Sequence, residues 1–187
     1  KKSYSKGEMI YEKGHRPNGM YYLLEGLIGL VTLSTSGQET LLRVFGRNYF
    51  FGHRSFFAAE PYHASALTLT DTKVVYFPFQ SVQDLLKCHP DWIPHFLMVL
   101  SKELRLSEDR FNDLTGKKVM SRIIEALIFL KKRHPDYLWT RREIGEYCGA
   151  QTETVTRVLS KLEAEGFIKK QGREIHIFDD NQLLGFS

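Results

Sequence analysis

The apolar residues of this chain change their spacing about halfway along it, and this change limits the folds that the chain can adopt. Up to about residue 80, apolar and aromatic residues alternate or form short runs, with Gly14, Gly26 and Gly46 between them. Short strands with glycine at the corners are typical of an all-β barrel, sandwich or roll. Farther along, the spacing becomes helical. We therefore expect an α+β protein in which an amino-terminal β-roll precedes a set of helices.

After the β-rich part comes a series of residues spaced alternately by four and three positions, which is the pattern of a heptad seam. The predicted seam residues are Ile93, Leu97, Leu100, Leu104, Ser107, Phe111 and Leu114. An amphipathic helix packed on its own domain is one interpretation. A stripe three heptads long needs an equally long apolar partner, so we favour a dimerisation helix that pairs with a second copy of the chain.

The remaining residues predict three helices followed by a β-hairpin. The stretch NDLTGKKV precedes the first helix, and Gly116 within it indicates a hinge at residues 113–117. Thr140 and Glu143 form a capping box that begins the second helix, and Gly149 permits a sharp turn into the third. Helix, turn, helix and hairpin make a winged helix-turn-helix. The predicted domains are 1–90 (β-roll), 91–115 (dimerisation helix and hinge) and 116–187 (winged helix-turn-helix).

The third of these helices has an apolar stripe and a polar face of unusual composition. Its apolar residues fall at i, i+3, i+4 and i+7, and they are Val155, Val158, Leu159 and Leu162. The opposite face carries Glu153, Thr156, Arg157 and Ser160. In a winged helix-turn-helix this helix enters the DNA major groove. There an arginine can bind guanine O6 and N7, and a glutamate can accept a hydrogen bond from cytosine N4. The alternative is an ordinary solvated helix face.

Basic residues around this helix and the hairpin are expected to contact DNA phosphates. The net charge of +4 is compatible with a polyanionic partner, although it is weak evidence alone. The predicted DNA-binding residues are Arg141, Gln151, Thr152, Glu153, Thr156, Arg157, Ser160, Lys161, Lys169, Lys170 and Arg173.

Three stretches resemble the Crp/Fnr superfamily of bacterial transcription regulators. TRREIGEYCGAQTETVTRVLSKLEAEGFI is similar to the helix-turn-helix signature of that family, EKGHRPNGMYYLLEGLIGLV resembles its early roll strands, and DTKVVYFPFQSVQDLL resembles its last strand and following helix. The resemblance covers essentially the whole chain. It implies a jelly roll like the cyclic-nucleotide-binding domain, and a homodimeric, non-enzymatic regulator whose partners are double-stranded DNA, a second copy and RNA polymerase.

Within this family the recognition helix has two common forms. The catabolite-activator branch reads R-E-T-V-G-R and prefers TGTGA, whereas the fumarate–nitrate branch has Glu, Ser and Arg at the spacing of Glu153, Thr156 and Arg157 and prefers TTGAT. Here Thr152 stands in place of the first arginine, and Thr156 replaces the glycine. The resemblance therefore implies a palindromic site close to TTGAT-N4-ATCAA.

The effector pocket departs from the pattern of family members that bind cyclic AMP. Their cassette resembles F-G-E-x-x-L followed by R-S/T-A, in which the glutamate binds the ribose and the arginine pairs with the phosphate. In FFGHRSFFAAEPYHASALT, His53 replaces the glutamate, and His63 (or Tyr62, if the loop is one residue shorter) replaces the arginine. Cyclic AMP is therefore not expected. The candidate effector-pocket residues are Gly52, His53, Arg54, Ser55, Phe56, His63 and Ala64.

Three alternatives for this pocket stay open. Arg54 and the amides of Ser55 and Phe56 suit a small anion, a haem could take His53 or His63 as an axial ligand, and Phe56 and Phe57 could fill a vestigial pocket. The effector, if there is one, is therefore unknown at this point, and so are activation versus repression, the target genes and any residues before Lys1.

The cysteines and histidines do not have the spacing of a thiolate zinc site, an iron–sulfur cluster or a cupin-type metal site. Cys88 and Cys148 lie far apart without C-x-x-C spacing, which also argues against a disulfide framework. No apolar run reaches membrane-spanning length, and the first residues show no signal-peptide core, so we expect a cytoplasmic protein without a membrane partner. The rival interpretations are a β-roll that binds a small molecule or metal and carries a helical interaction module, and a purely structural interaction module.

Overall fold

The computed structural model describes residues 1–33, 37 and 39–186. The chain forms two compact units, Lys1–Ser107 and Glu108–Ser187, each with its own core. The division falls inside helix α3 (Trp92–Gly116), so the single helix contributes to both units. The three-part division made from the sequence stays a prediction. Within the described part of the chain, no helix combines the length and apolar character needed to cross a membrane.

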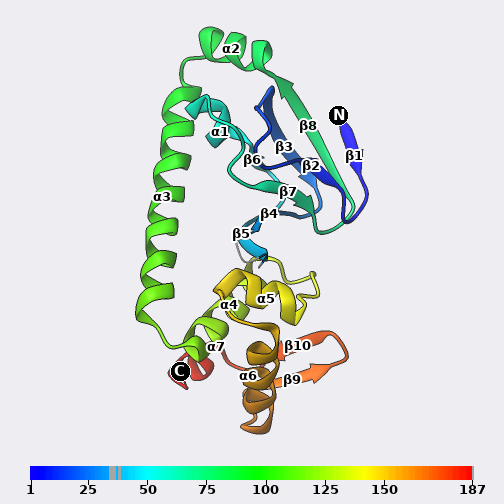
Figure 1. The fold of residues 1–187 in the computed structure, drawn as a ribbon, viewed down its shortest axis with the longest axis vertical. Coiled ribbons are helices and arrows are strands. Elements are labelled where there is room, and N and C mark those ends of the chain that lie inside the picture. The colour runs from blue at the N-terminus through cyan, green and yellow to red at the C-terminus, as the bar shows by residue number, and fades with distance from the viewer. Residues whose placement is uncertain (34–36, 38, 187) are drawn as a thin grey trace. The chain divides into compact units, whose positions relative to one another are not determined.

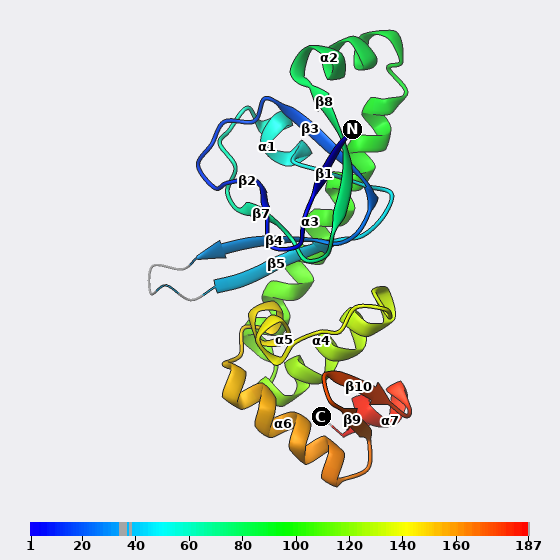
Figure 2. The ribbon, with the colours of Figure 1, turned by 90° about the vertical axis from the view of Figure 1, so that its right-hand side faces the viewer.

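The first unit contains two antiparallel four-stranded sheets (Figure 1 and Figure 2), with strand orders β1-β8-β3-β6 and β2-β7-β4-β5. The strands are β1 (Lys2–Tyr4), β2 (Met9–Tyr11), β3 (Gly19–Glu25), β4 (Ile28–Leu33), β5 (Glu39–Phe45), β6 (Tyr49–Phe51), β7 (Ser65–Thr68) and β8 (Thr72–Pro78). Strands that are distant in sequence pair with each other, as β1 does with β8 and β2 with β7. This is the β-roll that the sequence predicts.

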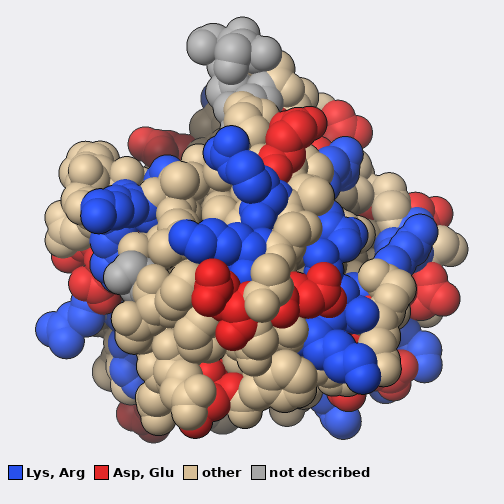
Figure 3. All heavy atoms as spheres, turned by 90° about the horizontal axis from the view of Figure 1, so that it is seen from below, with Lys and Arg blue, Asp and Glu red and all other residues tan. Residues whose placement is uncertain are grey.

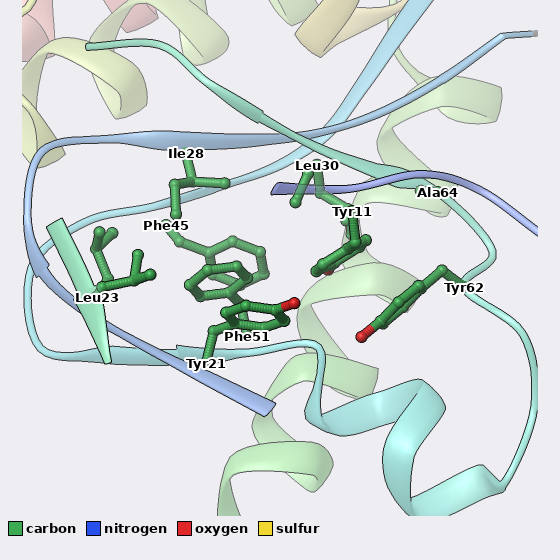
Figure 4. Packing of buried hydrophobic residues seen from close by; sticks show 11 residues of the cluster. Tyr11, Tyr21, Leu23, Ile28, Leu30, Phe45, Phe51, Tyr62 and Ala64 are labelled. Carbon is green, nitrogen blue, oxygen red and sulfur yellow. The ribbon is translucent and has the colours of Figure 1, made fainter. Parts of the chain in front are cut away.

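Aromatic side chains fill the interior of the roll (Figure 4). The rings of Tyr11 and Tyr62 stack with centroids 3.7 Å apart, and those of Tyr21 and Phe51 stack at 5.1 Å. Such pairs contribute about 0.5–1.5 kcal/mol each beyond the burial of their surface. Tyr62 is therefore the inward-pointing residue of its loop, whereas the neighbouring His63 is exposed.

Two further helices cover the roll, α1 (His53–Ala58) and α2 (Phe79–Cys88). The sequence predicted only strands up to about residue 80, and α1 corrects that expectation. Gly52, with a φ of 76°, takes a left-handed conformation that ends β6 and begins α1. Phe56 of α1 packs with Met20, Val82 and Phe96 on the side of the roll that faces the helices. Phe56 therefore packs outside the aromatic core of the roll and Phe57 is exposed, and the vestigial pocket stays one alternative.

The second unit contains three helices, a two-stranded hairpin and a short final helix that the sequence analysis did not anticipate. These elements are α4 (Val119–Arg133), α5 (Arg141–Cys148), α6 (Thr152–Ala164), β9 (Ile168–Gln171), β10 (Glu174–Ile177) and α7 (Asp180–Gly185). The core of this unit holds fully buried aliphatic residues from α4, α5 and α6, among them Ile123, Leu127, Ile144 and Leu159. This is the winged helix-turn-helix that the sequence predicts.

The junction between α3 and α4 is held by charged side chains. Lys117 Nζ lies 2.8 Å from Asp113 Oδ1 and 2.7 Å from Glu125 Oε2, and these two carboxylates raise the pKa of Lys117. Helix α3 continues through Gly116, and the helical pattern breaks only at Lys117 and Lys118. The hinge proposed for residues 113–117 therefore lies at an ion-paired junction, and whether it bends stays a prediction.

Candidate DNA-binding interface and effector site

The turn between α5 and α6 is fixed by its backbone geometry. The capping box is present, with Thr140 Oγ1 accepting a hydrogen bond from the Glu143 amide and the Glu143 carboxylate accepting one from the Thr140 amide. Gly149 closes α5 with a φ of 66°, and the Ala150 amide donates a 2.9 Å hydrogen bond to the Gly145 carbonyl. A Cβ atom on Gly145 would lie only 2.4 Å from the Ala150 carbonyl oxygen. The turn therefore requires glycine at 145, which the sequence analysis missed.

Helix α6 has the two faces that the sequence predicts. Val155, Leu159 and Leu162 are fully buried and Val158 nearly so, whereas the four residues of the polar face, Glu153, Thr156, Arg157 and Ser160, are exposed. Gln151 is the N-cap residue, and its side chain makes no capping bond. The Thr156 hydroxyl donates to the carbonyl of Thr152, 2.9 Å away, which fixes its rotamer. These exposed polar side chains therefore lie along the first turns of α6, whose opposite face is anchored in the core.

The hairpin places its basic residues in different situations. Pairing of Gln171 with Glu174 leaves Gly172 and Arg173 as the two turn residues, so Arg173 is exposed at the hairpin tip. Lys169 is also exposed. Lys170 is instead bound to α6, with its Nζ 2.8 Å from Glu163 Oε2 and 3.2 Å from Ser160 Oγ. Lys170 therefore fixes the hairpin to α6, which differs from the free phosphate contact expected for it.

The other predicted phosphate contacts, Arg141 and Lys161, lie on α5 and α6. Arg141 is partly exposed as the first residue of α5. Lys161 is exposed, with its Nζ 5.2 Å from the Phe186 ring centroid. In the view from below (Figure 3), acidic side chains lie among lysine and arginine side chains, so the charge in this view is mixed rather than uniformly basic.

The predicted seam residues of α3 are largely uncovered in the single chain. Leu97 is 59% exposed, Leu104 61% and Phe111 66%, and Ile93 and Leu114 are also exposed, while Leu100 is partly buried. Leu114 Cδ2 lies 3.0 Å from where a Cβ on Gly149 would be, so it also contacts its own helix-turn-helix. The polar seam residue Ser107 accepts a 3.2 Å hydrogen bond from Arg43 Nη2. An apolar stripe of this length on one helix offers a surface for a second helix.

In the first unit, α1 carries most of the predicted effector-pocket residues. Ser55 Oγ donates to the Pro61 carbonyl, and the Phe56 amide donates to the Gly52 carbonyl. The Phe56 amide is therefore not free to bind an anion, contrary to one expectation. Ala64 is buried in the roll core, and Arg54 is 42% exposed.

The two histidines of the predicted pocket have different surroundings. His53 is 1% exposed, and its Nε2 lies 3.4 Å from Glu103 Oε2. His63 is exposed; desolvation, followed by the charges of Arg54, Arg43 and Lys13, lowers its pKa. A neutral His63 cannot supply the positive charge with which an arginine would pair with a cyclic phosphate. Within the described residues, no three His, Cys, Asp or Glu side chains gather as a metal-binding group.

Glu103 of α3 is the residue of this site that the sequence analysis missed. Its carboxylate is 2% exposed and lies 2.7 Å from Arg43 Nη1, 3.4 Å from His53 Nε2 and 4.0 Å from Arg54 Nε. Burial raises the pKa of Glu103, but the nearby imidazole of His53 and the charge of Arg43 outweigh burial and hold the pKa below its usual value. The carboxylate is therefore ionised within a cationic pocket.

Each of the two units matches a known protein family. Residues 1–89 match the cyclic nucleotide-binding domain family, and residues 121–186 match the Crp-like helix-turn-helix domain family. The chain is 25% identical to a CRP-like cAMP-activated global transcriptional regulator of Mycobacterium tuberculosis, over 96% of this chain and 84% of that protein. It is 26% identical to the cAMP-activated global transcriptional regulator CRP of Pasteurella multocida, over 93% and 87%.

The chain is also similar to solved structures. The structure of FixK2 from Bradyrhizobium japonicum superimposes with a TM-score of 0.86 at 25% identity, covering 98% of this chain and 94% of that one. These relatives are transcription regulators and not enzymes. With a cyclic-nucleotide-binding-like roll, a long helix and a Crp-like helix-turn-helix in this order, the chain belongs to the Crp/Fnr superfamily of transcription regulators.

Proposed function

We propose that the chain acts as a homodimer in the cytoplasm and binds a palindromic DNA site close to TTGAT-N4-ATCAA, where it affects transcription through RNA polymerase. The observation that carries the proposal is the face of α6. Glu153, Thr156 and Arg157 are exposed at the amino-terminal part of a helix whose opposite face is fully buried. Side chains at this part of a recognition helix reach base edges in the major groove.

The chemistry of this face favours particular bases. Arg157 presents a planar fork that matches guanine O6 and N7, and Glu153 is a hydrogen-bond acceptor for the cytosine amino group. TTGAT contains one guanine on the strand shown and its cytosine partner on the other. Thr156, held by its bond to the Thr152 carbonyl, is short enough to allow close approach to the DNA. Arg173 at the hairpin tip and Lys169 are placed as phosphate contacts.

Fluorescence anisotropy at one fixed salt concentration tests the DNA site. Three labelled duplexes of equal length would carry TTGAT-N4-ATCAA, the same spacing with TGTGA half-sites, or a scrambled sequence. We expect the tightest binding to the first duplex. Tighter binding to the TGTGA duplex would assign the chain the other specificity. Equal binding to all three would favour a structural interaction module, because phosphate contacts alone do not distinguish sequences.

The proposed regulator does not depend on cyclic AMP, unlike the two relatives whose names describe them as activated by cAMP. His53 is enclosed against Glu103 and His63 is neutral, so neither replaces the missing anchors. We expect cyclic AMP to leave the affinity for the specific duplex unchanged. Allosteric effectors commonly change affinity by about 5–150-fold, so an increase in that range on titration with cyclic AMP would contradict this part of the proposal.

A further inference from the structure

Among the ion pairs of the described residues, Arg43, His53 and Arg54 share one anionic partner, the Glu103 carboxylate. These three partners come from strand β5 and helix α1, whereas Glu103 comes from α3. In Figure 1, α1 lies between the strands and α3, so the contact joins the roll to the long helix within one compact unit. Arg43 strengthens the connection, because its Nη2 also donates to the Glu103 carbonyl and the Ser107 hydroxyl.

The geometry of this cluster is that of a carboxylate-binding site that is already filled. A buried carboxylate is stable only when several donors and positive charges replace its lost hydration. Glu103 has two guanidinium groups and an imidazole within 4.0 Å. These contacts are ion-pair distances, since neither Glu103 oxygen and neither His53 nitrogen has a hydrogen-bond partner among the described residues. Removing the carboxylate would leave the guanidinium of Arg43, whose side chain is 17% exposed, without its anion. An incoming small carboxylate would find the same donors.

We propose that Glu103 is the internal ligand of the effector site: its side chain occupies a carboxylate-binding site and positions α3 on the roll for DNA binding, in the place of a small molecule. This inference rests on the proposed function, because its readout is specific DNA binding. Glu103 is a positioning residue and does not touch DNA. Small carboxylates such as acetate are the class of ligand that this site accepts when the side chain is shortened.

Chemical rescue tests the proposal with four forms of the full chain. Glu103→Ala removes the carboxylate and leaves room for acetate, Glu103→Gln removes the charge but keeps the volume, and Asp109→Ala removes an exposed carboxylate of the same helix. The three variants and the unchanged chain are each titrated onto the specific duplex in two buffers of equal ionic strength, one with chloride and one with acetate in its place. Constant ionic strength is required because DNA affinity depends strongly on salt.

We expect Glu103→Ala and Glu103→Gln to bind the specific duplex at least tenfold more weakly in chloride. Acetate should restore most of the affinity of Glu103→Ala and none of that of Glu103→Gln, since the glutamine amide still fills the space. Asp109→Ala should match the unchanged chain in both salts. Unimpaired DNA binding by Glu103→Gln, or an equal response of all four forms to acetate, would overturn the proposal.

Thermal unfolding in the same two salts separates this proposal from the proposed function. If the unchanged chain fails to distinguish specific from scrambled DNA, the proposed function fails. In that case, if the carboxylate-binding site around residue 103 exists, acetate should still raise the unfolding temperature of Glu103→Ala more than that of Glu103→Gln. Absence of that difference would rule out the carboxylate-binding site. Circular dichroism of each variant shows whether it is folded before binding is measured, and if Glu103→Ala does not fold, Glu103→Gln alone decides by its DNA affinity.

Discussion

Arg157 is the residue through which the proposed DNA specificity can be tested most directly. It is exposed on α6 and lies opposite the buried stripe of that helix. If its guanidinium binds a guanine in each half-site, Arg157→Ala should cost about 1–3 kcal/mol per half-site and relax the preference for guanine at that position. Anisotropy titrations with duplexes that carry each of the four bases there would measure both effects.

Lys161 supplies the matched control for Arg157, because it lies one helical turn farther along α6 and is also exposed. As a phosphate contact, Lys161→Ala should weaken binding to specific and scrambled DNA alike and reduce the slope of log K against log salt concentration by about one unit per half-site. The assignment of Arg157 would be wrong if Arg157→Ala behaved in the same way.

Glu103 predicts a dependence of stability on pH. The pKa of Glu103 is lowered in the folded chain, so its stabilisation is complete above the unfolded value of about 4.3 and is lost as the pH falls through the folded value. Glu103→Gln should lower the free energy of unfolding by roughly 3–5 kcal/mol at pH 7, because it breaks a buried ion cluster. Urea titrations at pH 7, 5, 4 and 3 should show this difference shrinking only below about pH 4.3. A difference that is the same at pH 7 and pH 3 would contradict the assignment.

The sequence predicted some residues of the candidate sites and could not predict others. Glu153, Thr156 and Arg157 could be placed on one exposed face because a helix period decides which side chains share a face. Glu103 could not be found in the same way. Between Lys102 and Leu104, a glutamate on a helix looks solvent-exposed, and its burial depends on Arg43 and His53, which lie far away in sequence.

Among the elements of the second unit, the turn between α5 and α6 has the strictest steric requirement for glycine. A methyl group at Gly145 would lie 2.4 Å from the Ala150 carbonyl oxygen, whereas a methyl group at Gly116 would meet no atom within 4 Å. Gly145→Ala should therefore destabilise the second unit by about 1–3 kcal/mol, the usual cost of overpacking. It should also weaken specific DNA binding, because α6 must shift to make room. Thermal unfolding and anisotropy would measure the two effects.

Gly116→Ala is the control for this prediction, since it makes the same chemical change at the end of α3. Alanine is the better helix former by about 1 kcal/mol, so thermal unfolding of this variant should show neutral or slightly raised stability. Similar losses in both variants would mean that the second unit tolerates no added methyl group, and the steric argument for the turn would fail.

The elements differ in how far the sequence could predict them. The capping box at Thr140 and the stripe of α6 depend on neighbours within one or two helical turns, so local pattern was sufficient. Helices α1 and α7 were missed as six-residue segments, too short to show a helical period. Helix α1 begins because Gly52 adopts a positive φ, and its register is then set by Phe56 packing on Val82 and Phe96. That packing comes from the tertiary fold.

For the whole molecule, the central prediction is that the α3 seam holds two copies together. Leu104 and Leu106 are both exposed leucines of α3, 61% and 51% respectively, but only Leu104 occupies a seam position. Leu106 lies two residues farther on, about 200° around the helix. Substituting each leucine in turn by glutamate therefore distinguishes an effect on the seam from the general effect of adding a charge to α3.

Leu104→Glu should convert the dimer to a monomer, because two carboxylates facing each other across a coiled-coil seam are neither paired nor hydrated. Leu106→Glu should remain a dimer. Sedimentation velocity would measure the oligomeric state, and anisotropy on the palindrome should show at least ~100-fold weaker binding for Leu104→Glu, because each half-site is then bound independently. On a duplex with a single half-site the two variants should bind equally, since the α6 face is intact in both. If both variants stay dimeric, another surface holds the copies together, and the exposed leucines of α3 must then be covered by something other than a second α3.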